Sequence, residues 1–231
     1  MRIIAHRSGP NVFPEQTIAS ARHAVEDGAD LVEIDVRFTA DNALAVCHDP
    51  NAKRVFGVDK AICDMTKTEY LALRHADAPD YGSHLFEDYL KCGIGPLLIH
   101  IKEDRVIPEL LRQIAQYDYL DKVVLGVGTL EAVRVSREIE PEIRILEFMP
   151  KPELTEEFAA AGVDYIRLWE GWMTEETVAA VKATGKELWI MTMAQGVSDA
   201  GITTCEGLRK VLSYGVDGVL INDVNELKAV L

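Results

Sequence analysis

The chain has 231 residues, a formal net charge of −14 and a hydrophobic content of 48%. This length suits one α/β barrel or one large α/β domain, and the hydrophobic content is ordinary for a globular protein with a large core. The acidic balance argues against nucleic-acid partners, which require a basic face, and against nonspecific binding to anionic membranes.

The four cysteines lack the short paired spacing of a zinc site, so we expect reduced thiols and no Cys-x-x-Cys cluster. No run approaches about eighteen apolar residues, and the first residues enter a predicted strand directly. We therefore expect no stable membrane insertion and a cytoplasmic location.

The first predicted elements are a strand, a helix and a second strand. Residues 3–6 are a short apolar run that ends in His6-Arg7. Residues 17–26 have helical periodicity, and Gly28 is a natural stop. Residues 31–37 alternate between side-chain types and are rich in β-branched residues, which is typical of a strand.

The second strand carries two carboxylates, Glu33 and Asp35, in the middle of an apolar run. Side chains repeat every two residues on a strand, so both carboxylates point to one face and need a cation such as a metal ion. Asp41-Asn42 is a turn signal, and residues 44–48 are a second alternating run. An antiparallel hairpin would bring His48 close to Asp35; the alternative is a surface hairpin with ordinary charges.

After Asp49 the helix and strand periodicity becomes weak, which indicates an insertion with two short helical stretches, near residues 68–74 and 86–90. Long insertions in compact domains usually serve an active site. After Pro96 strands and helices alternate. Strands are predicted at 97–102, 123–127, 143–148, 164–168, 187–193 and 218–221, and helices near 105–117, 129–139, 153–161, 174–184, 204–214 and 224–231. With the first two strands this makes eight, which predicts a single α/β domain over residues 1–231, a (β/α)₈ TIM barrel with a hairpin and an insertion after the second strand.

The functional residues of such a barrel lie at the carboxyl ends of its strands. The predicted strand ends and the hairpin arm supply carboxylates, histidines and basic residues: His6, Arg7, Glu33, Asp35, His48, His100 and Lys102. Carboxylates hold a divalent cation, Arg and Lys bind an oxyanion, and histidines act as acid and base. Together these groups indicate metal-assisted cleavage of a phosphodiester.

Several stretches resemble the glycerophosphodiester phosphodiesterase family, whose pattern is His-Arg-Gly, Pro-Glu-Asn-Thr, Glu-x-Asp-Val and His-Asp. The corresponding stretches are His6-Arg7-Ser8, Pro14-Glu15-Gln16-Thr17, Glu33-Ile34-Asp35-Val36 and His48-Asp49, and the match continues in residues 98–102 and 215–223. The resemblance thus runs from one end of the chain to the other.

The resemblance implies a TIM barrel with bound Mg²⁺ or Ca²⁺ that hydrolyses small glycerophosphodiesters of lipid metabolism to glycerol 3-phosphate and an alcohol. It implies that His6 and His48 are the acid–base pair and that Glu33 and Asp35 are metal ligands. It also implies that Arg7 and Lys102 lie near the phosphate. Glu15 would be a supporting residue.

Two departures from the family pattern concern the metal and the pocket. His100 stands where the family has a third carboxylate, so we expect a metal site of Glu33, Asp35 and His100 in which Mn²⁺ or another transition metal can replace Mg²⁺ or Ca²⁺. The family's Trp-Thr-Val-Asn segment falls at residues 191–194, which lack the Trp. Trp169 and Trp172 either replace it or are loop aromatics without a role.

Two other functions stay open from the sequence. One is a related barrel enzyme that releases a cyclic phosphate, and the other is a catalytically weak protein that binds a phosphate ligand. The remaining histidines, His23, His75 and His84, are expected on the surface.

Overall fold

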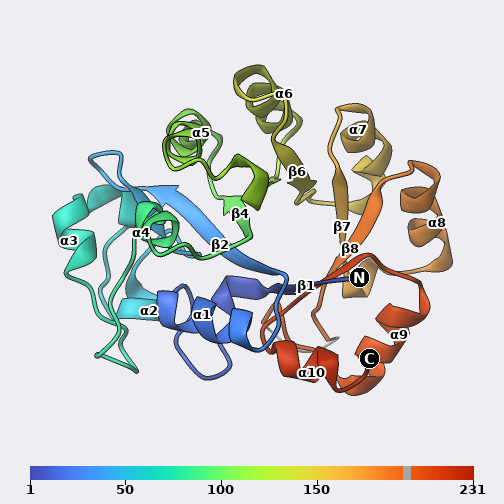
Figure 1. Cartoon of the computed structure of the whole chain (residues 1–231), viewed down its shortest axis with the longest axis horizontal. Coiled ribbons are helices and arrows are strands. Elements are labelled where there is room, and N and C mark those ends of the chain that lie inside the picture. The colour runs from blue at the N-terminus through green and yellow to red at the C-terminus, as the bar shows by residue number, and fades with distance from the viewer. Residues whose placement is uncertain (195–198) are drawn as a thin grey trace.

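Eight parallel strands close into a barrel (Figure 1). The structure is a computed structural model that describes residues 1–194 and 199–231. The strands follow the order β1-β9-β8-β7-β6-β5-β4-β2, and pairing of β1 with β2 closes the ring. Their bounds are β1 (Arg2–Ala5), β2 (Leu31–Phe38), β4 (Leu97–Ile101), β5 (Val123–Val127), β6 (Arg144–Glu147), β7 (Tyr165–Trp169), β8 (Glu187–Met191) and β9 (Gly218–Ile221). The TIM-barrel prediction is confirmed.

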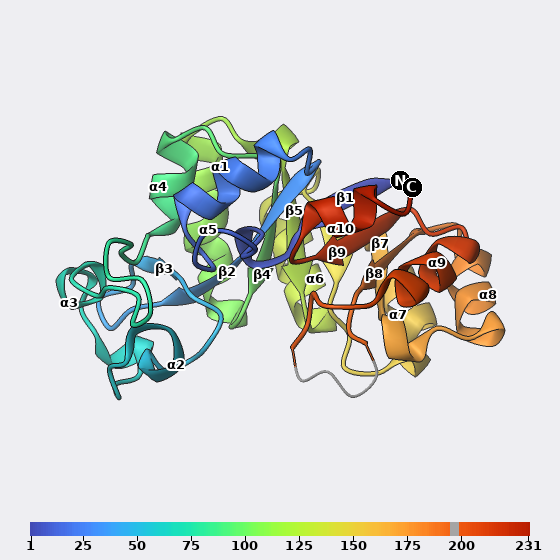
Figure 2. The ribbon, with the colours of Figure 1, turned by 90° about the horizontal axis from the view of Figure 1, so that it is seen from below.

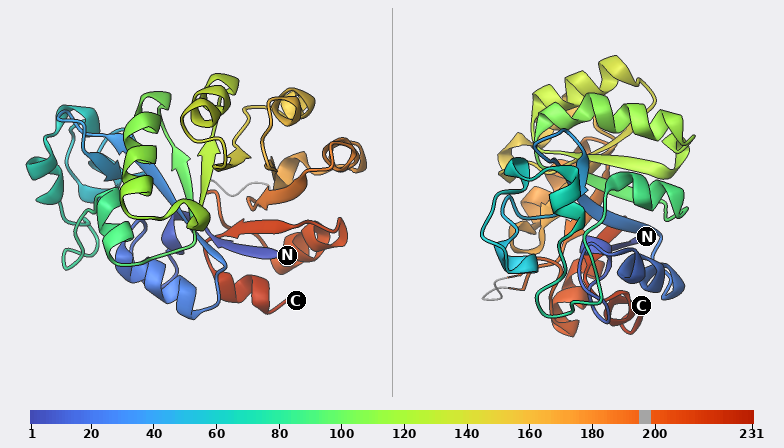
Figure 3. Two further views of the ribbon diagram at one scale, coloured as in Figure 1. Left: turned by 45° about the horizontal axis from the view of Figure 1, so that its top comes forward. Right: turned by 90° about the vertical axis from the view of Figure 1, so that its left-hand side faces the viewer.

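Helices surround the barrel, as Figure 3 shows, because each strand is followed by a helix that returns the chain to the next parallel strand. Several of them begin at a Thr or Asp whose side chain accepts a backbone N–H, as at Thr17, Thr129 and Asp223. The surrounding helices are α1 (Ile18–Glu26), α4 (Phe86–Lys91), α5 (Ile107–Gln116), α6 (Leu130–Ile139), α7 (Thr155–Ala160), α8 (Glu175–Ala183), α9 (Cys205–Ser213) and α10 (Val224–Lys228). Short 3₁₀ helices lie at His6–Ser8, Ile62–Asp64, Asp104–Val106, Leu120–Lys122, Pro152–Leu154 and Glu170–Trp172.

The strand alternation divides the core into two layers. On β2, Val32, Ile34 and Val36 face the helices in the larger layer. Leu31 faces the barrel interior with apolar residues of the other strands, among them Leu98. Further along β2 the interior positions are the carboxylates, so the inside of the barrel changes from apolar to charged toward the strand ends.

The hairpin after β2 forms as predicted. β2 is longer than its neighbours, and its last residues pair antiparallel with β3 (Leu44–Val46), with Val36 opposite Val46. The backbone N–H of Cys47 then donates to the Asp35 carbonyl at 3.0 Å, which brings His48 to the edge of the barrel beside Asp35.

The insertion packs around its own small core and projects to one side of the barrel, at the left of Figure 2. It contains β3, α2 (Lys53–Phe56) and α3 (Lys67–Leu71). The helix expected over 68–74 corresponds to α3, which ends earlier, at Leu71. The sequence did not predict α2, because a single turn leaves no helical periodicity. No helix in residues 1–194 and 199–231 has the length and apolar character needed to cross a bilayer.

Candidate active site

Glu33, Asp35 and His100 come together inside the barrel at the carboxyl ends of β2 and β4. The strand register places Asp35 directly opposite His100. His100 Nδ1 lies 3.1 Å from Asp35 Oδ1 and 4.0 Å from Glu33 Oε1. Each side chain offers one ligand atom, and these three atoms lie within 4.8 Å of one another. The three residues form a candidate metal site.

The charges of this cluster are unequal. Burial, together with the neighbouring Asp35, raises the pKa of Glu33 well above its usual value. Burial acts on Asp35 in the same direction, but Lys102 and His100 outweigh it and hold the pKa of Asp35 well below its usual value. Lys102 Nζ lies 2.7 Å from Asp35 Oδ1 and 3.0 Å from His100 Nδ1. Burial and Lys102 lower the pKa of His100 to about 3, so its imidazole is neutral at pH 7.

This donor set fits a divalent cation. Both carboxylates are almost fully buried, at 1% exposure or less, where paired negative charge is costly without a counter-charge. Within residues 1–194 and 199–231, Asp35 Oδ1 is buried and has ion-pair neighbours but no partner in hydrogen-bond geometry. Two carboxylates and a neutral imidazole suit Mn²⁺ and similar ions, and the carboxylates suit Mg²⁺ and Ca²⁺.

The second oxygens of the carboxylates are fixed by the loop after β1. Gln16 Nε2 donates to Asp35 Oδ2 at 2.6 Å, and the backbone N–H of Arg7 donates to Glu33 Oε2 at 2.7 Å. Arg7 and Gln16 adopt left-handed backbone conformations, with φ of 48° and 59°. Such conformations cost energy in non-glycine residues and are characteristic of functional sites. The strained loop therefore orients the candidate ligands.

His6 lies on the same loop and is buried. Its Nδ1 is 2.7 Å from Asn222 Oδ1, which can only accept, so Nδ1 carries the proton and Nε2 is free to take one. Burial and the charge of Arg7 lower the pKa of His6 to about 4. Gly201 packs so closely here that a Cβ would lie 2.5 Å from His6 Nδ1.

His48 is held by a chain of charges that crosses from the hairpin to the insertion. Its Nδ1 is 2.7 Å from Asp49 Oδ1, and Arg54 of α2 pairs with both Asp49 and Glu15. Glu15 also contacts Arg7 at 3.3 Å. Burial lowers the pKa of His48, which favours the neutral ring.

Phe148 covers the ring face of His100. The two rings are stacked at a centroid distance of 3.8 Å. Phe148 follows β6, and it reaches His100 on β4 by crossing Gly126 on the strand between them, where a Cβ would lie 2.6 Å from Phe148 Cε2. The glycine therefore allows the stacking.

All the predicted site residues meet at this end of the barrel, but sequence reasoning did not identify several that position them. These are Gln16, Asn222, Arg54 and Phe148. Gln16 and Asn222 lie within recognised motifs, which was an available signal, whereas nothing near Arg54 or Phe148 indicated their partners. The surface prediction for His75 was wrong: it is 7% exposed and packs edge-on against Phe56 in the core of the insertion.

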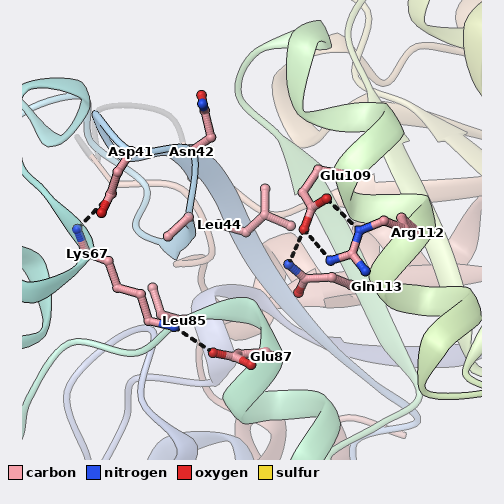
Figure 4. Close-up of a pocket in the computed structure, with 10 residues that line it drawn as sticks. Asp41, Asn42, Leu44, Lys67, Leu85, Glu87, Glu109, Arg112 and Gln113 are labelled. Carbon is pink, nitrogen blue, oxygen red and sulfur yellow. Dashed lines mark hydrogen bonds and ion pairs between the residues drawn. The ribbon is translucent and has the colours of Figure 1, made fainter.

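A separate cleft of about 270 Å³ lies outside the barrel, between the hairpin and α4 and α5 (Figure 4). Its charged side chains pair with one another, as Lys67 does with Glu87 and Arg112 with Glu109. None of the residues of the candidate metal site lines it. We therefore place the functional site at the barrel end and not in this cleft.

A family of known proteins matches most of this chain. Residues 6–198 match the model of the glycerophosphoryl diester phosphodiesterase family. A glycerophosphodiester phosphodiesterase of Caldanaerobacter subterraneus is 25% identical over 97% of this chain and 95% of its own length, and one of Bacillus altitudinis is 23% identical over 94% and 93%.

Solved structures show the same fold. A glycerophosphodiester phosphodiesterase of Agrobacterium tumefaciens superposes with a TM-score of 0.81 at 20% identity, covering 98% of this chain and 99% of that one. An Oleispira antarctica phosphodiesterase in complex with the product sn-glycerol-3-phosphate gives a TM-score of 0.84 at 19% identity, covering 100% and 96%. The chain belongs to the glycerophosphoryl diester phosphodiesterase family of hydrolases.

Proposed function

We propose that this enzyme hydrolyses small glycerophosphodiesters to glycerol 3-phosphate and an alcohol, with a divalent cation at Glu33, Asp35 and His100. One observation carries the proposal: the candidate metal ligands lie at the same end of the barrel as two histidines whose Nδ1 atoms are fixed by Asn222 and Asp49. The names of the full-length relatives support the substrate class.

Arg7 and Lys102 are the proposed phosphate-binding residues. Arg7 Nε is buried and has no hydrogen-bond partner in residues 1–194 and 199–231, so it is available to an anionic oxygen. Glu15 holds the Arg7 guanidinium from the other side and limits its orientations. A positive Lys102 near the ligand set offsets charge that develops on the phosphoryl oxygens.

His6 and His48 are the proposed acid and base. The ring that acts as base is neutral and takes a proton at Nε2 from the attacking oxygen. The ring that acts as acid is protonated at both nitrogens and donates its Nε2 proton to the leaving alkoxide. Asn222 and Asp49 each accept a hydrogen bond from Nδ1–H and so leave Nε2 as the atom that takes or donates the proton. The attacking oxygen belongs to water or to the glycerol half of the substrate, which would give a cyclic phosphate.

A divalent cation at the ligand set would polarise a phosphoryl oxygen and orient a substrate hydroxyl. The two carboxylates favour Mg²⁺ or Ca²⁺, and the imidazole of His100 makes Mn²⁺ or another transition ion a suitable alternative.

The test is hydrolysis of several glycerophosphodiesters by wild type and by His6→Ala and His48→Ala, with glycerol 3-phosphate measured by a coupled dehydrogenase. Removal of an acid or base lowers the rate on the order of 10²–10⁴-fold. His23→Ala, a helix position outside the site, is the matched control and should retain full activity. Near-full activity in His48→Ala would refute the acid–base pair.

Two further outcomes separate the alternatives. Accumulation of a cyclic phosphate, and no turnover of a diester that lacks the glycerol hydroxyl next to the phosphate, would select the cyclising reaction. Tight binding of a diester without turnover at any divalent cation would select a binding protein.

A further inference from the structure

Arg167 is a buried arginine whose charge the proposed mechanism does not use. It lies on β7 between Tyr165, which faces the barrel interior, and Trp169 at the strand end, so strand alternation turns its side chain inward as well. The residue is 2% exposed. Within residues 1–194 and 199–231, its Nε and Nη1 atoms are buried and have no hydrogen-bond partner. Such donors are costly to leave unsatisfied.

Two other arginines that lie over aromatic rings each form an ion pair with a carboxylate. Arg2 lies over Tyr165 and Trp189 at the opposite end of the barrel and pairs with Glu187. Arg105 lies over Phe38 and pairs with Glu103. Arg167 also contacts rings, but no carboxylate of the described residues forms an ion pair with it.

Glu147 is the acidic residue whose charge acts on Arg167, but its oxygens bond to backbone groups. Its two carboxylate oxygens accept hydrogen bonds from the backbone N–H groups of Arg167 and Met149, and neither of these bonds involves the Arg167 guanidinium. Burial also lowers the pKa of Arg167, to about 10, so the group still carries its charge at pH 7. Burial raises the pKa of Glu147 to about 7, so its charge compensates the Arg167 guanidinium only in part.

Three rings surround the guanidinium and connect it to the active site. Its Cζ lies 4.6 Å from the Trp169 ring centroid, 5.6 Å from that of Trp172 and 5.1 Å from that of Phe148. Phe148 is the ring that stacks on His100. Arg167 thus sits one aromatic ring away from the candidate metal site. All three rings are half-buried, so the aromatic cluster around the guanidinium is partly exposed to solvent.

This position differs from that of the proposed phosphate-binding residues. Lys102 contacts the Nδ1 edge of His100, whereas Phe148 covers its face and separates it from Arg167. Arg167 therefore suits a second group of the substrate better than the phosphate under attack.

We propose that Arg167, with Phe148, Trp169 and Trp172, forms a subsite for an anionic group on the alcohol half of the diester. This inference rests on the proposed hydrolase function. An aromatic cage alone would attract a quaternary ammonium such as choline. Here the cage already holds a cation, which repels a second one and offers two free N–H donors to a carboxylate or a phosphate.

The experiment compares substrates that differ only in the anionic group. Glycerophosphoserine and glycerophosphoethanolamine differ by one carboxylate, and glycerophosphoinositol with and without a ring phosphate differ by one phosphate. We expect wild type to have a kcat/KM about 10-fold or more higher for the anionic member of at least one pair, which is about 1.4 kcal/mol. Which pair responds identifies carboxylate or phosphate as the group that is bound.

Arg167→Gln should reduce that ratio to within about twofold, and Arg167→Lys should retain part of it. Arg2→Gln is the matched control, because Arg2 also packs on aromatic rings of this barrel, and it should leave the ratio unchanged. Equal ratios in wild type and Arg167→Gln would overturn the subsite.

Failure of the hydrolase function is recognised separately, as absence of turnover on every diester. In that case calorimetric titration of the same substrate pairs into wild type and Arg167→Gln makes the comparison without turnover. A tenfold preference in Kd that depends on Arg167 supports the subsite, and equal Kd values refute it.

Discussion

Replacement of Gly201 by Ala should disable His6 by displacing both its ring and its partner Asn222, because a Cβ at Gly201 would lie 2.5 Å from His6 Nδ1. A Cβ at Gly201 would lie 2.0 Å from Asn222 Oδ1, whereas real Cβ contacts essentially never fall below 3.0 Å, so Asn222 must move by about 1 Å. The backbone cannot yield easily, because Gly201 bonds to Thr192 at 2.7 Å and to Asn222 at 2.8 Å. The His6 Nδ1–H then loses its acceptor, at a cost of about 1–3 kcal/mol, which corresponds to a kcat roughly 10- to 100-fold lower.

Backbone strain must be separated from this effect. Gly201 has φ of 87°, and Ala in this region costs about 1–2 kcal/mol of stability. Gly162 has a similar φ of 92° and nothing within 4 Å of a Cβ, so Gly162→Ala carries the strain without the clash. The assay is kcat for glycerol 3-phosphate release, with unfolding by denaturant measured on the same samples. If both variants have the same kcat, the proposed role of the His6–Asn222 contact is refuted.

Three other results are expected. His100→Glu should shift metal preference toward Ca²⁺ or Mg²⁺ and away from Mn²⁺ in calorimetric titrations, because it restores an oxygen ligand; an unchanged preference would mean that His100 is no ligand. His6 has a pKa lowered to about 4, so the folded state binds fewer protons than the unfolded state. The contribution of His6 to the free energy of unfolding should therefore be constant above about pH 6.5 and fall by up to about 3 kcal/mol toward pH 4. Denaturant titrations in chelator should show a shallower dependence of this free energy on pH for His6→Asn than for wild type, and an equal dependence would contradict the lowered pKa of His6. Arg54→Met should lower kcat several-fold, because Arg54 links Asp49 to Glu15. Lys53→Met, at the neighbouring exposed position, should leave kcat unchanged, because Lys53 pairs with Asp59 instead.

The barrel and most of its site were predictable because they depend on short-range rules. The two-residue period of a strand placed Glu33 with Asp35 and His100 with Lys102, and parallel strands bring their carboxyl ends to one edge. The turn at Asp41-Asn42 added His48. These rules need only local sequence, and the register of β2 against β4 then sets Asp35 opposite His100.

What could not be predicted depends on contacts between distant segments. Phe148 reaches His100 only because Gly126 leaves room on the intervening strand, and no local pattern marks that crossing. Arg54 lies in a single helical turn of the insertion, where its partners are set by packing. His75 reads as a loop residue, yet the insertion folds over it and buries it.

Hydrolysis should depend on a divalent cation that Glu33, Asp35 and His100 hold. The direct measurement is the rate of glycerol 3-phosphate release by chelator-treated protein as Mg²⁺, Ca²⁺ or Mn²⁺ is added back, for wild type and Glu33→Gln. We predict no turnover before addition, full recovery in wild type, and at least about tenfold more cation for half-maximal rate in Glu33→Gln. Undiminished turnover in the presence of chelator, or identical cation dependence in the two proteins, would show that these residues do not hold a cation needed for hydrolysis.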